Sequence, residues 1–246
     1  VNLDQKFGDK VNAGVKLNFS QINSDNVSIG NGGLWENAGV VLSAIQFDPT
    51  LPVFDENGNY QPNVRQSNFH NPVSILEIEN KTRLEHLMAT AYVNYRILPE
   101  LSLRLQTGFD RNQSQNYHYN PTTTISGKST EGRADRAGNE STNYQLQLLL
   151  NYLKTFQDKH NISTTLGTEV MKYNYESINA TATNFPYDGA LWWNMGLGAD
   201  RPWVGSYGSY SELLSYFMRL SYDYDFKYFI TANFRIDGSS KFSTDN

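Results

Sequence analysis

Cysteine is absent from the 246 residues of this chain, and so are long apolar runs. Without cysteine, disulfides and thiolate metal sites are excluded. No stretch approaches the roughly 18 consecutive apolar residues of a transmembrane helix, which excludes a helical membrane protein. A membrane β-barrel stays open, because polar residues alternate with apolar ones along its strands. The formal net charge of −5 gives no reason to expect nucleic acid as a partner.

Motifs for catalysis and metal binding are lacking as well. There is no nucleophile elbow, phosphate loop or HExxH pair, and the four histidines show no metal-ligand spacing. Asp55-x-Asn57-x-Asn59 looks like the start of a calcium loop, but Tyr60 stands where that loop needs glycine and Gln66 where it needs glutamate. Asn57 and the glycine after it are better read as a hairpin turn. We therefore expect neither an enzyme nor a bound metal or cofactor.

Aromatic residues are abundant, at 13% of the chain with 16 tyrosines, and they lie in runs that alternate between apolar and polar side chains. Alternation with a period of two indicates strands with one apolar and one polar face. It occurs in four pairs of runs, each pair joined by a short turn. The predicted strands are Val1–Phe7 and Val11–Gln21, Leu84–Ile97 and Leu101–Asn112, Ser141–Phe156 and His160–Lys172, and Ser211–Tyr224 and Tyr228–Phe242.

The connections between these runs fall into two classes by length. The turns are a few residues long, whereas the links between hairpins are much longer: Ile22–Arg83, Gln113–Glu140 and Asn174–Tyr210. Short turns at one end and long loops at the other are typical of an outer-membrane barrel. Strands of roughly 11 to 15 residues also suit a membrane span, whereas the strands of soluble sandwiches are commonly about 5 or 6 residues long.

The last two predicted strands carry a specific motif. SYFMRLSYDY (215–224) followed by KYFITANFRIDGSSKF (227–242) resembles a signature segment of the SusC/RagA family of TonB-linked outer-membrane transporters of Bacteroidetes. Segments at 71–77, 91–96 and 159–161 are also similar to this family, so the resemblance covers nearly the whole chain. The matching positions in the two strands are Tyr216, Phe217, Arg219, Tyr222, Tyr224, Arg235, Asp237, Gly238, Ser239, Ser240 and Phe242.

The resemblance implies that residues 1–246 are part of a TonB-dependent-receptor β-barrel domain. Such transporters use about 22 antiparallel strands around a plugged lumen. This chain would supply about eight strands in four hairpins, with periplasmic turns and extracellular loops. The plug domain and the remaining strands would lie outside it.

The implied function is import of oligosaccharides or peptides across the outer membrane of a Gram-negative bacterium. The implied partners are a SusD-like surface lipoprotein, the TonB complex acting through parts outside this chain, and outer-membrane lipid. Two other functions stay open: a secreted carbohydrate-binding β-domain without a transport role, and a passive porin-like channel.

Aromatic side chains in the long loops are the candidates for substrate contact. Aromatic faces stack on sugar rings and anchor peptide side chains. The alternative is that these rings form small cores within the loops. The candidate substrate-binding residues are Trp35, Trp192, Trp193, Trp203, Tyr207 and Tyr210.

Two further groups follow from the alternation. Arg235 and Asp237 share one strand face and are expected to form a lumen-facing ion pair. Tyrosines gather near the short turns, where an aromatic girdle would sit at the level of the lipid headgroups; tyrosine is also simply a good strand former. The tyrosines near the turns are Tyr95, Tyr152, Tyr222, Tyr224 and Tyr228.

Overall fold

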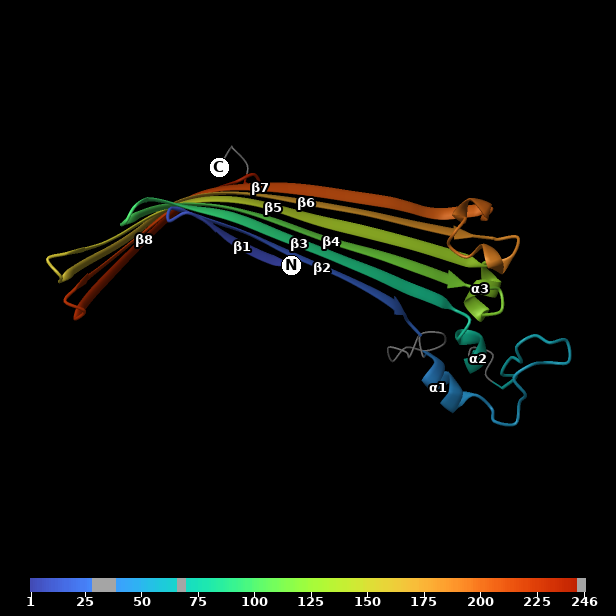
Figure 1. Cartoon of the computed structure of the whole chain (residues 1–246). Coiled ribbons are helices and arrows are strands. Elements are labelled where there is room, and N and C mark those ends of the chain that lie inside the picture. The colour runs from blue at the N-terminus through green and yellow to red at the C-terminus, as the bar shows by residue number, and fades with distance from the viewer. Residues whose placement is uncertain (28–38, 66–69, 243–246) are drawn as a thin grey trace.

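A single antiparallel sheet makes up most of the computed structural model, which describes residues 1–27, 39–65 and 70–242. The order of the eight strands in the sheet follows their order in the chain, as Figure 1 shows. The all-β fold predicted from the alternation is confirmed. The strands are β1 (Asn2–Phe7), β2 (Val11–Asp25), β3 (Glu79–Leu98), β4 (Leu101–Asn120), β5 (Arg133–Phe156), β6 (His160–Thr183), β7 (Asp200–Tyr224) and β8 (Tyr228–Ser239).

The helices among the described residues are short and lie at the end of the sheet where the long links are (Figure 1). None of the described helices is long and apolar enough to cross a membrane. They are α1 (Gly39–Gln46), α2 (Pro72–Ile75), α3 (Ile125–Ser129), η2 (Asp188–Ala190) and η3 (Met195–Leu197).

The opposite end of the sheet carries the tight turns. Between β5 and β6, Gln157 and Asp158 both have positive φ, of 49° and 53°. Between β7 and β8, Asp225 and Phe226 do the same, at 52° and 53°. Two successive residues with positive φ form the type of turn whose twist matches that of the flanking strands. The short turns predicted at these positions are confirmed.

The pairing register assigns every strand residue to one of two faces, because residues paired across a ladder lie on the same side of the sheet. We call one the leucine face and the other the glutamine face. The leucine face includes the paired residues Val93, Leu105, Leu148, Thr168, Tyr216 and Ile236, and every second residue from them along each strand. The glutamine face includes the paired residues Tyr92, Gln106, Gln147, Glu169, Ser215 and Asp237.

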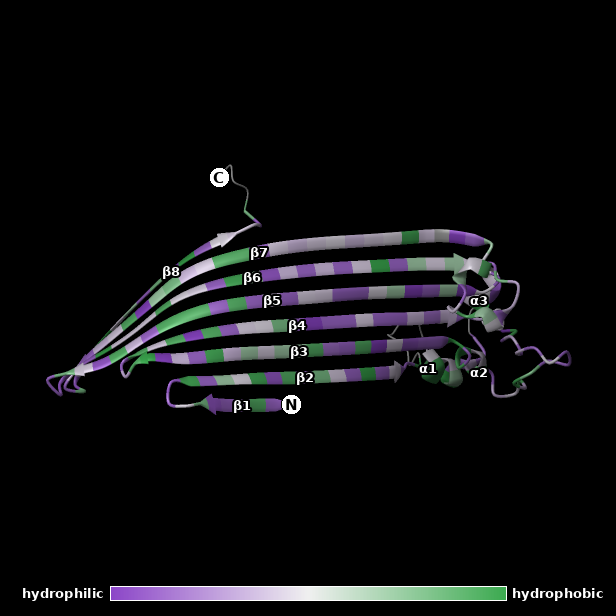
Figure 2. Cartoon of the chain, turned by 45° about the horizontal axis from the view of Figure 1, so that its top comes forward, coloured by the Kyte–Doolittle hydropathy of each residue, from purple (hydrophilic) through white to green (hydrophobic). Residues whose placement is uncertain are grey.

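The leucine face changes character along the strands. From the turns up to the row of Phe109 and Tyr144, which we call the turn half, it is mostly apolar, with threonines such as Thr164 and Thr168 between the leucines and an ion pair of Lys172 with Glu212 in that last row. Beyond that row, in the loop half, it carries ion pairs such as Arg111 with Glu140. In Figure 2 the hydrophobic colour is accordingly concentrated toward the turn end of the strands and the hydrophilic colour toward the loop end.

The strands from β2 to β7 extend farther into the loop half than predicted. For example, β5 begins at Arg133 instead of Ser141, and β7 begins at Asp200 instead of Ser211. At the other end of the chain, β8 stops at Ser239, short of the predicted Phe242. The extensions were missed because both of their faces are largely polar, so no apolar alternation marks them, although the backbone ladder continues without interruption.

The main cluster of buried apolar residues lies at the loop end. Tyr119, Ala134 and Ala182 share one row of the leucine face there, and they are covered by residues of the segment between β6 and β7. We call this cluster the loop core. Its buried members are Tyr119, Ala134, Ala182, Phe185, Ala190 and Trp192.

Candidate functional site

The glutamine face of the loop half carries an aromatic surface that is open to solvent in this chain. Trp203 and Tyr207 lie in strand β7, not in a loop as predicted, and their exposed fractions are 52% and 63%. Tyr207 lies against Tyr175 of β6, with 6.2 Å between the ring centroids. Gly205 makes room for the Trp203 indole, because a Cβ at that position would lie 2.7 Å from the Trp203 Cζ2 atom. The sheet therefore holds two of the predicted residues on one face.

A charged network lies beside Trp203 on the same face. Asp135 accepts hydrogen bonds from Arg133 Nε at 2.8 Å and from Thr181 Oγ1 at 2.6 Å, and His118 Nδ1 lies 3.6 Å from its Oδ2 atom. Burial raises the pKa of the Asp135 carboxyl, but the hydrogen bonds from His118, Arg133 and Thr181 outweigh it and bring that pKa well below its usual range. Asp135 is therefore a fixed negative charge next to the aromatic surface.

Trp192 and Trp193 lie elsewhere, against the leucine-face side of the loop half. Trp192 is 3% exposed and packs on Tyr117 with 5.6 Å between centroids, while Lys81 Nζ lies 5.5 Å from its ring. Trp193 follows at 5.9 Å from Trp192 but is 75% exposed. Trp192 is thus a packing residue of the loop core.

The other two predicted residues do not join the aromatic surface. Tyr210 pairs with Asn174, and the register places both on the leucine face at the lower edge of the loop half. Its side chain is 76% exposed. Trp35 lies outside the described residues. The structure therefore brings Trp203 and Tyr207 onto one face and separates Trp192, Trp193 and Tyr210 from them.

Sequence reasoning missed Tyr175 and Asp135. Asp135 lies shortly before the predicted strand Ser141–Phe156, and Tyr175 lies shortly after the predicted strand His160–Lys172. The apolar pattern assigned both residues to links. The signal that could have found Tyr175 is the pair Tyr173-x-Tyr175. It places two aromatic rings on one face with a period of two and so continues the alternation of the predicted strand. For Asp135, only the register reveals its neighbours, since Thr181 lies 46 residues away in the chain.

A second polar cluster lies on the glutamine face of the turn half. Arg235 donates from Nε to Asp237 Oδ1 at 2.7 Å and from Nη2 to Ser215 Oγ at 2.9 Å. Its Nη2 atom also lies 3.3 Å from Oε2 of Glu169, which is only 6% exposed and receives a further hydrogen bond from Gln145. The ion pair predicted between Arg235 and Asp237 is confirmed, and Glu169 and Ser215 extend it into a network over β5, β6, β7 and β8.

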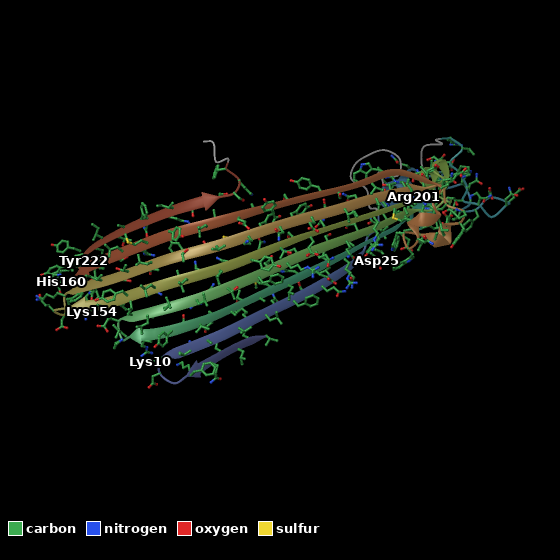
Figure 3. The ribbon with its side chains drawn as sticks, turned by 90° about the horizontal axis from the view of Figure 1, so that it is seen from above. Lys10, Asp25, Lys154, His160, Arg201 and Tyr222 are labelled. Atoms are coloured by element: carbon green, nitrogen blue, oxygen red, sulfur yellow. The ribbon has the colours of Figure 1, made fainter. Side chains whose placement is uncertain are left out.

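The tyrosines near the turns lie on the leucine face, as the register of their strands requires. Figure 3 shows His160 and Tyr222 together at the turn end of the sheet, whereas Asp25 and Arg201 lie at the loop end. His160 Nδ1 and Tyr222 Oη are 2.8 Å apart. A row of amphipathic rings therefore borders the apolar part of the leucine face, and its role as a membrane girdle stays a prediction.

Two smaller predictions concern possible metal sites. Asp55 Oδ1 accepts hydrogen bonds from the backbone N–H groups of Asn57 and Asn59, and Phe54 bridges to Tyr60, which confirms the hairpin turn at Asn57-Gly58. Within residues 1–27, 39–65 and 70–242, no group of three or more histidine or carboxylate side chains is placed to hold a metal ion.

Similarity to known proteins bears on the fold and on the family. The whole of this chain aligns with TonB-dependent receptor P3 of Formosa agariphila at 29% identity. The whole chain also aligns with TonB-dependent receptor P26 of the same organism at 25% identity. No family model matches the chain. This chain matches a segment of TonB-dependent receptors. The resemblance seen in the sequence is thereby confirmed, and the matched proteins are receptors, not enzymes.

Solved structures agree on the fold of this receptor segment. The structure of the RagAB peptide transporter superposes on the whole chain with a TM-score of 0.80 at 16% identity, and the RagAB peptide importer in a "closed-closed" state does so at 0.76 and 18%. The sheet therefore has the fold of a segment of the β-barrel wall in these structures. The chain spans about a quarter of the length of each of these receptors and transporter chains.

Proposed function

We propose that this chain is part of the barrel wall of a receptor that imports oligosaccharides or peptides across the outer membrane of a Gram-negative bacterium. The observation that carries the proposal is the match of the entire chain to TonB-dependent receptors. The two faces of the sheet support it, because one face is mostly apolar at the turn end, whereas the other is mostly polar there and carries the network of Arg235, Asp237 and Glu169.

The height of the apolar part suits an outer membrane. On the leucine face of β5 the side chains are apolar or aromatic from Tyr144 until Lys154. From Tyr144 to Lys154 the strand advances by ten residues, or about 34 Å along its length. At the ~40° tilt of barrel strands this becomes about 26 Å across the membrane, close to the ~25 Å apolar band of outer-membrane barrels. We therefore assign the leucine face of the turn half to lipid and the glutamine face to the barrel interior.

The orientation follows from the connections. Outer-membrane barrels place their short turns in the periplasm and their long loops outside the cell. With the turns periplasmic, the loop half rises beyond the lipid, and Trp203, Tyr207 and Tyr175 face the entrance of the barrel. These three rings, beside the Asp135 carboxylate, are the surface that an entering sugar or peptide would contact.

The proposed partners act at the two ends of the wall. A SusD-like surface lipoprotein would close over the loop end, where Tyr187, Trp193 and Leu197 are exposed. The TonB complex would supply energy through parts of the receptor outside this chain. The proposal requires no cofactor.

Uptake by cells that carry the full-length receptor tests the function. We expect one labelled mixture, of oligopeptides or of oligosaccharides, to be imported in a manner abolished by a protonophore. Trp203→Ala and Tyr207→Ala should each weaken substrate binding by about 2 kcal/mol, roughly thirtyfold, as for the loss of an aromatic anchor. Tyr210→Ala, at an exposed ring on the opposite face, is the matched control and should have little effect.

Three results would contradict the proposal. Import that persists in the presence of the protonophore would indicate a passive channel. A full-length protein that is soluble and monomeric without detergent would indicate a secreted binding domain. Equal losses of affinity in the Trp203 and Tyr210 variants would remove the aromatic surface from the substrate path.

A further inference from the structure

A groove of about 550 Å³ crosses the leucine face of the loop half, from β4 to β7. Gly138, Ser206 and Gly208 form its floor, because these positions of the leucine face carry little or no side chain. Glu140 and Glu176 border it, and the register pairs these two carboxylates directly across β5 and β6. Because the leucine face of the same strands is assigned to lipid in the turn half, this groove lies on the outside of the barrel wall.

The two glycines of the groove are not required by the strands that contain them. Neither has a positive φ, and the ladders run past both without a register shift. A Cβ at Gly138 would lie 3.7 Å from Ile178 Cγ2, and one at Gly208 would lie 3.7 Å from the Tyr175 carbonyl oxygen, which are ordinary contacts. Glycine inside a strand costs stability, and where no bulge or bend needs it, it marks a place where another molecule approaches the backbone.

The height of the groove excludes an ordinary phospholipid as its occupant. Glu140 lies four residues beyond Tyr144 along β5, and Gly138 lies six residues beyond it. At the ~40° tilt of barrel strands, the groove therefore lies about 10–16 Å beyond the apolar band. The headgroup layer of a phospholipid bilayer extends only about 5–8 Å beyond the hydrocarbon on each side. A lipid seated on the leucine face reaches the groove only if its headgroup carries several sugars.

The charges of the leucine face change with height in the order that such a headgroup requires. Lys172 lies in the row of Tyr144, and Arg111 lies one row closer to the loops, about 5 Å beyond the apolar band. Both are held by carboxylates, Lys172 Nζ by Glu212 at 2.7 Å and Arg111 Nη2 by Glu140 at 2.6 Å. Cations therefore lie at the level of lipid phosphates, and carboxylates lie above them at the level of the groove.

The carboxylates of the groove suit hydroxyl groups better than a cation. Ionised carboxylates accept several hydrogen bonds, and those bonds are stronger than bonds between neutral groups. Within the part of the wall that the structure describes, no three acidic or histidine side chains are placed to hold a metal ion. Sugar hydroxyls are donors of the kind that Glu140 and Glu176 can bind.

We propose that the leucine face of the loop half docks the saccharide headgroup of an outer-leaflet glycolipid, whose acyl chains lie on the leucines of the turn half. The sugars occupy the groove, and their hydroxyls donate to Glu140 and Glu176. Continuity identifies the occupant, since the same face of the same strands runs from the lipid band into the groove. The proposal rests on the proposed function only for the assignment of the leucine face to lipid.

The test uses the full-length receptor, purified in detergent with a chelator present so that no divalent cation bridges the carboxylates. The probes are a rough-form lipopolysaccharide, which carries core sugars, and lipid A, which ends at its phosphorylated disaccharide. Binding of each probe is measured by titration. The native receptor should bind the lipopolysaccharide about tenfold or more tightly than lipid A, because several hydroxyls donate to charged acceptors.

Variants of the groove separate docking from folding. Gly208→Val should abolish the preference for lipopolysaccharide, because its side chain fills the groove. The same variant should leave the unfolding temperature in lipid-free detergent unchanged or raised, because valine is a better strand former than glycine. Glu176→Gln removes a charged acceptor and should reduce the preference about threefold. Ala180→Val, one row beyond the groove on the same face, is the matched control and should keep the preference.

Equal binding of the two probes, or a preference that Gly208→Val retains, would overturn the proposal. A lower unfolding temperature of Gly208→Val in lipid-free detergent would also overturn it, because a segment of the receptor itself would then fill the groove. Dissociation of a receptor dimer by Gly208→Val would assign the groove to a second copy instead. A receptor that imports substrate but shows no preference loses the docking surface alone. A receptor that shows the preference but no import loses the transport function alone.

Discussion

The two halves of the sheet share the same strands and the same backbone ladder but are stabilised differently. The loop half packs its own apolar core, with Trp192 at 3% exposed and Tyr119 and Ala134 at 0%. The turn half exposes its leucines on one face and has no such cluster among the residues that the structure describes. Backbone pairing alone therefore does not decide the environment of a strand. The loop half is stabilised by contacts within the chain, and the turn half depends on what surrounds it.

The largest expected effect that separates the halves is loss of the loop core. Trp192→Ala should destabilise the loop end by about 3–5 kcal/mol, because removing a buried large aromatic side chain leaves a cavity. Limited proteolysis of the full-length receptor should show faster cleavage between β6 and β7, with barrel assembly intact. The adjacent and exposed Trp193→Ala is the control. Equal cleavage of both variants would mean that the loop core does not hold this segment.

A charge introduced on the leucine face should be harmful in the turn half and tolerated in the loop half. Leu148→Arg should cost about 2–4 kcal/mol and impair assembly, because it puts a guanidinium into lipid near mid-membrane. Gln113→Arg, on the same face in the loop half, and Gln147→Arg, on the opposite face of the turn half, should be tolerated. Heat-modifiable electrophoretic mobility measures assembly. Comparable damage from all three substitutions would contradict the assignment of the leucine face to lipid.

A smaller effect is expected within the turn half, on the glutamine face. Gly167→Ala should destabilise the wall by about 1–3 kcal/mol, because its Cβ would overlap the Phe217 ring and force it to move. Gly108→Ala is the matched control, since its nearest neighbour would be Gln145 Oε1 at 3.5 Å. Thermal unfolding of the full-length receptor provides the measurement. If Gly108→Ala costs as much as Gly167→Ala, the ring is not what requires glycine.

The smallest expected effect is a dependence on pH at the loop end. The folded pKa of Asp135 lies below its ordinary value of about 4, so its contribution to stability is present above that value and is lost as the pH falls below it. The side chain is 28% exposed, and we expect a contribution of about 1 kcal/mol or less. The difference in Tm between the native receptor and Asp135→Asn should therefore shrink between pH 7 and pH 3. A constant difference would contradict this role.

The sequence predicted the turn half much better than the loop half. In the turn half, leucine and tyrosine alternate with glutamine and arginine, so period two could be read directly, and the pairing of Arg235 with Asp237 followed from it. In the loop half, Glu140, Glu176 and their neighbours are polar on both faces, and polar strands resemble loops when only hydropathy is considered. Trp203 and Tyr207 were consequently placed in a loop.

The candidate site was also only partly predictable from the sequence. Trp203 and Tyr207 were found by residue type, because exposed aromatics near glycines indicate contact surfaces. Their separation from Trp192 could not be predicted, since it depends on which row of the sheet the segment between β6 and β7 covers.

The agreement between strand order and chain order has a consequence for how the wall assembles. Each hairpin closes over a turn of two or three residues, whereas joining β2 to β3 closes a link from residue 26 to residue 78. Because the entropy of loop closure grows as the logarithm of length, that join costs about 3 kcal/mol more than a tight turn. Hairpins should therefore form first as local units and then add to one another edge to edge. The last ladder to close between hairpins would be the one between β2 and β3.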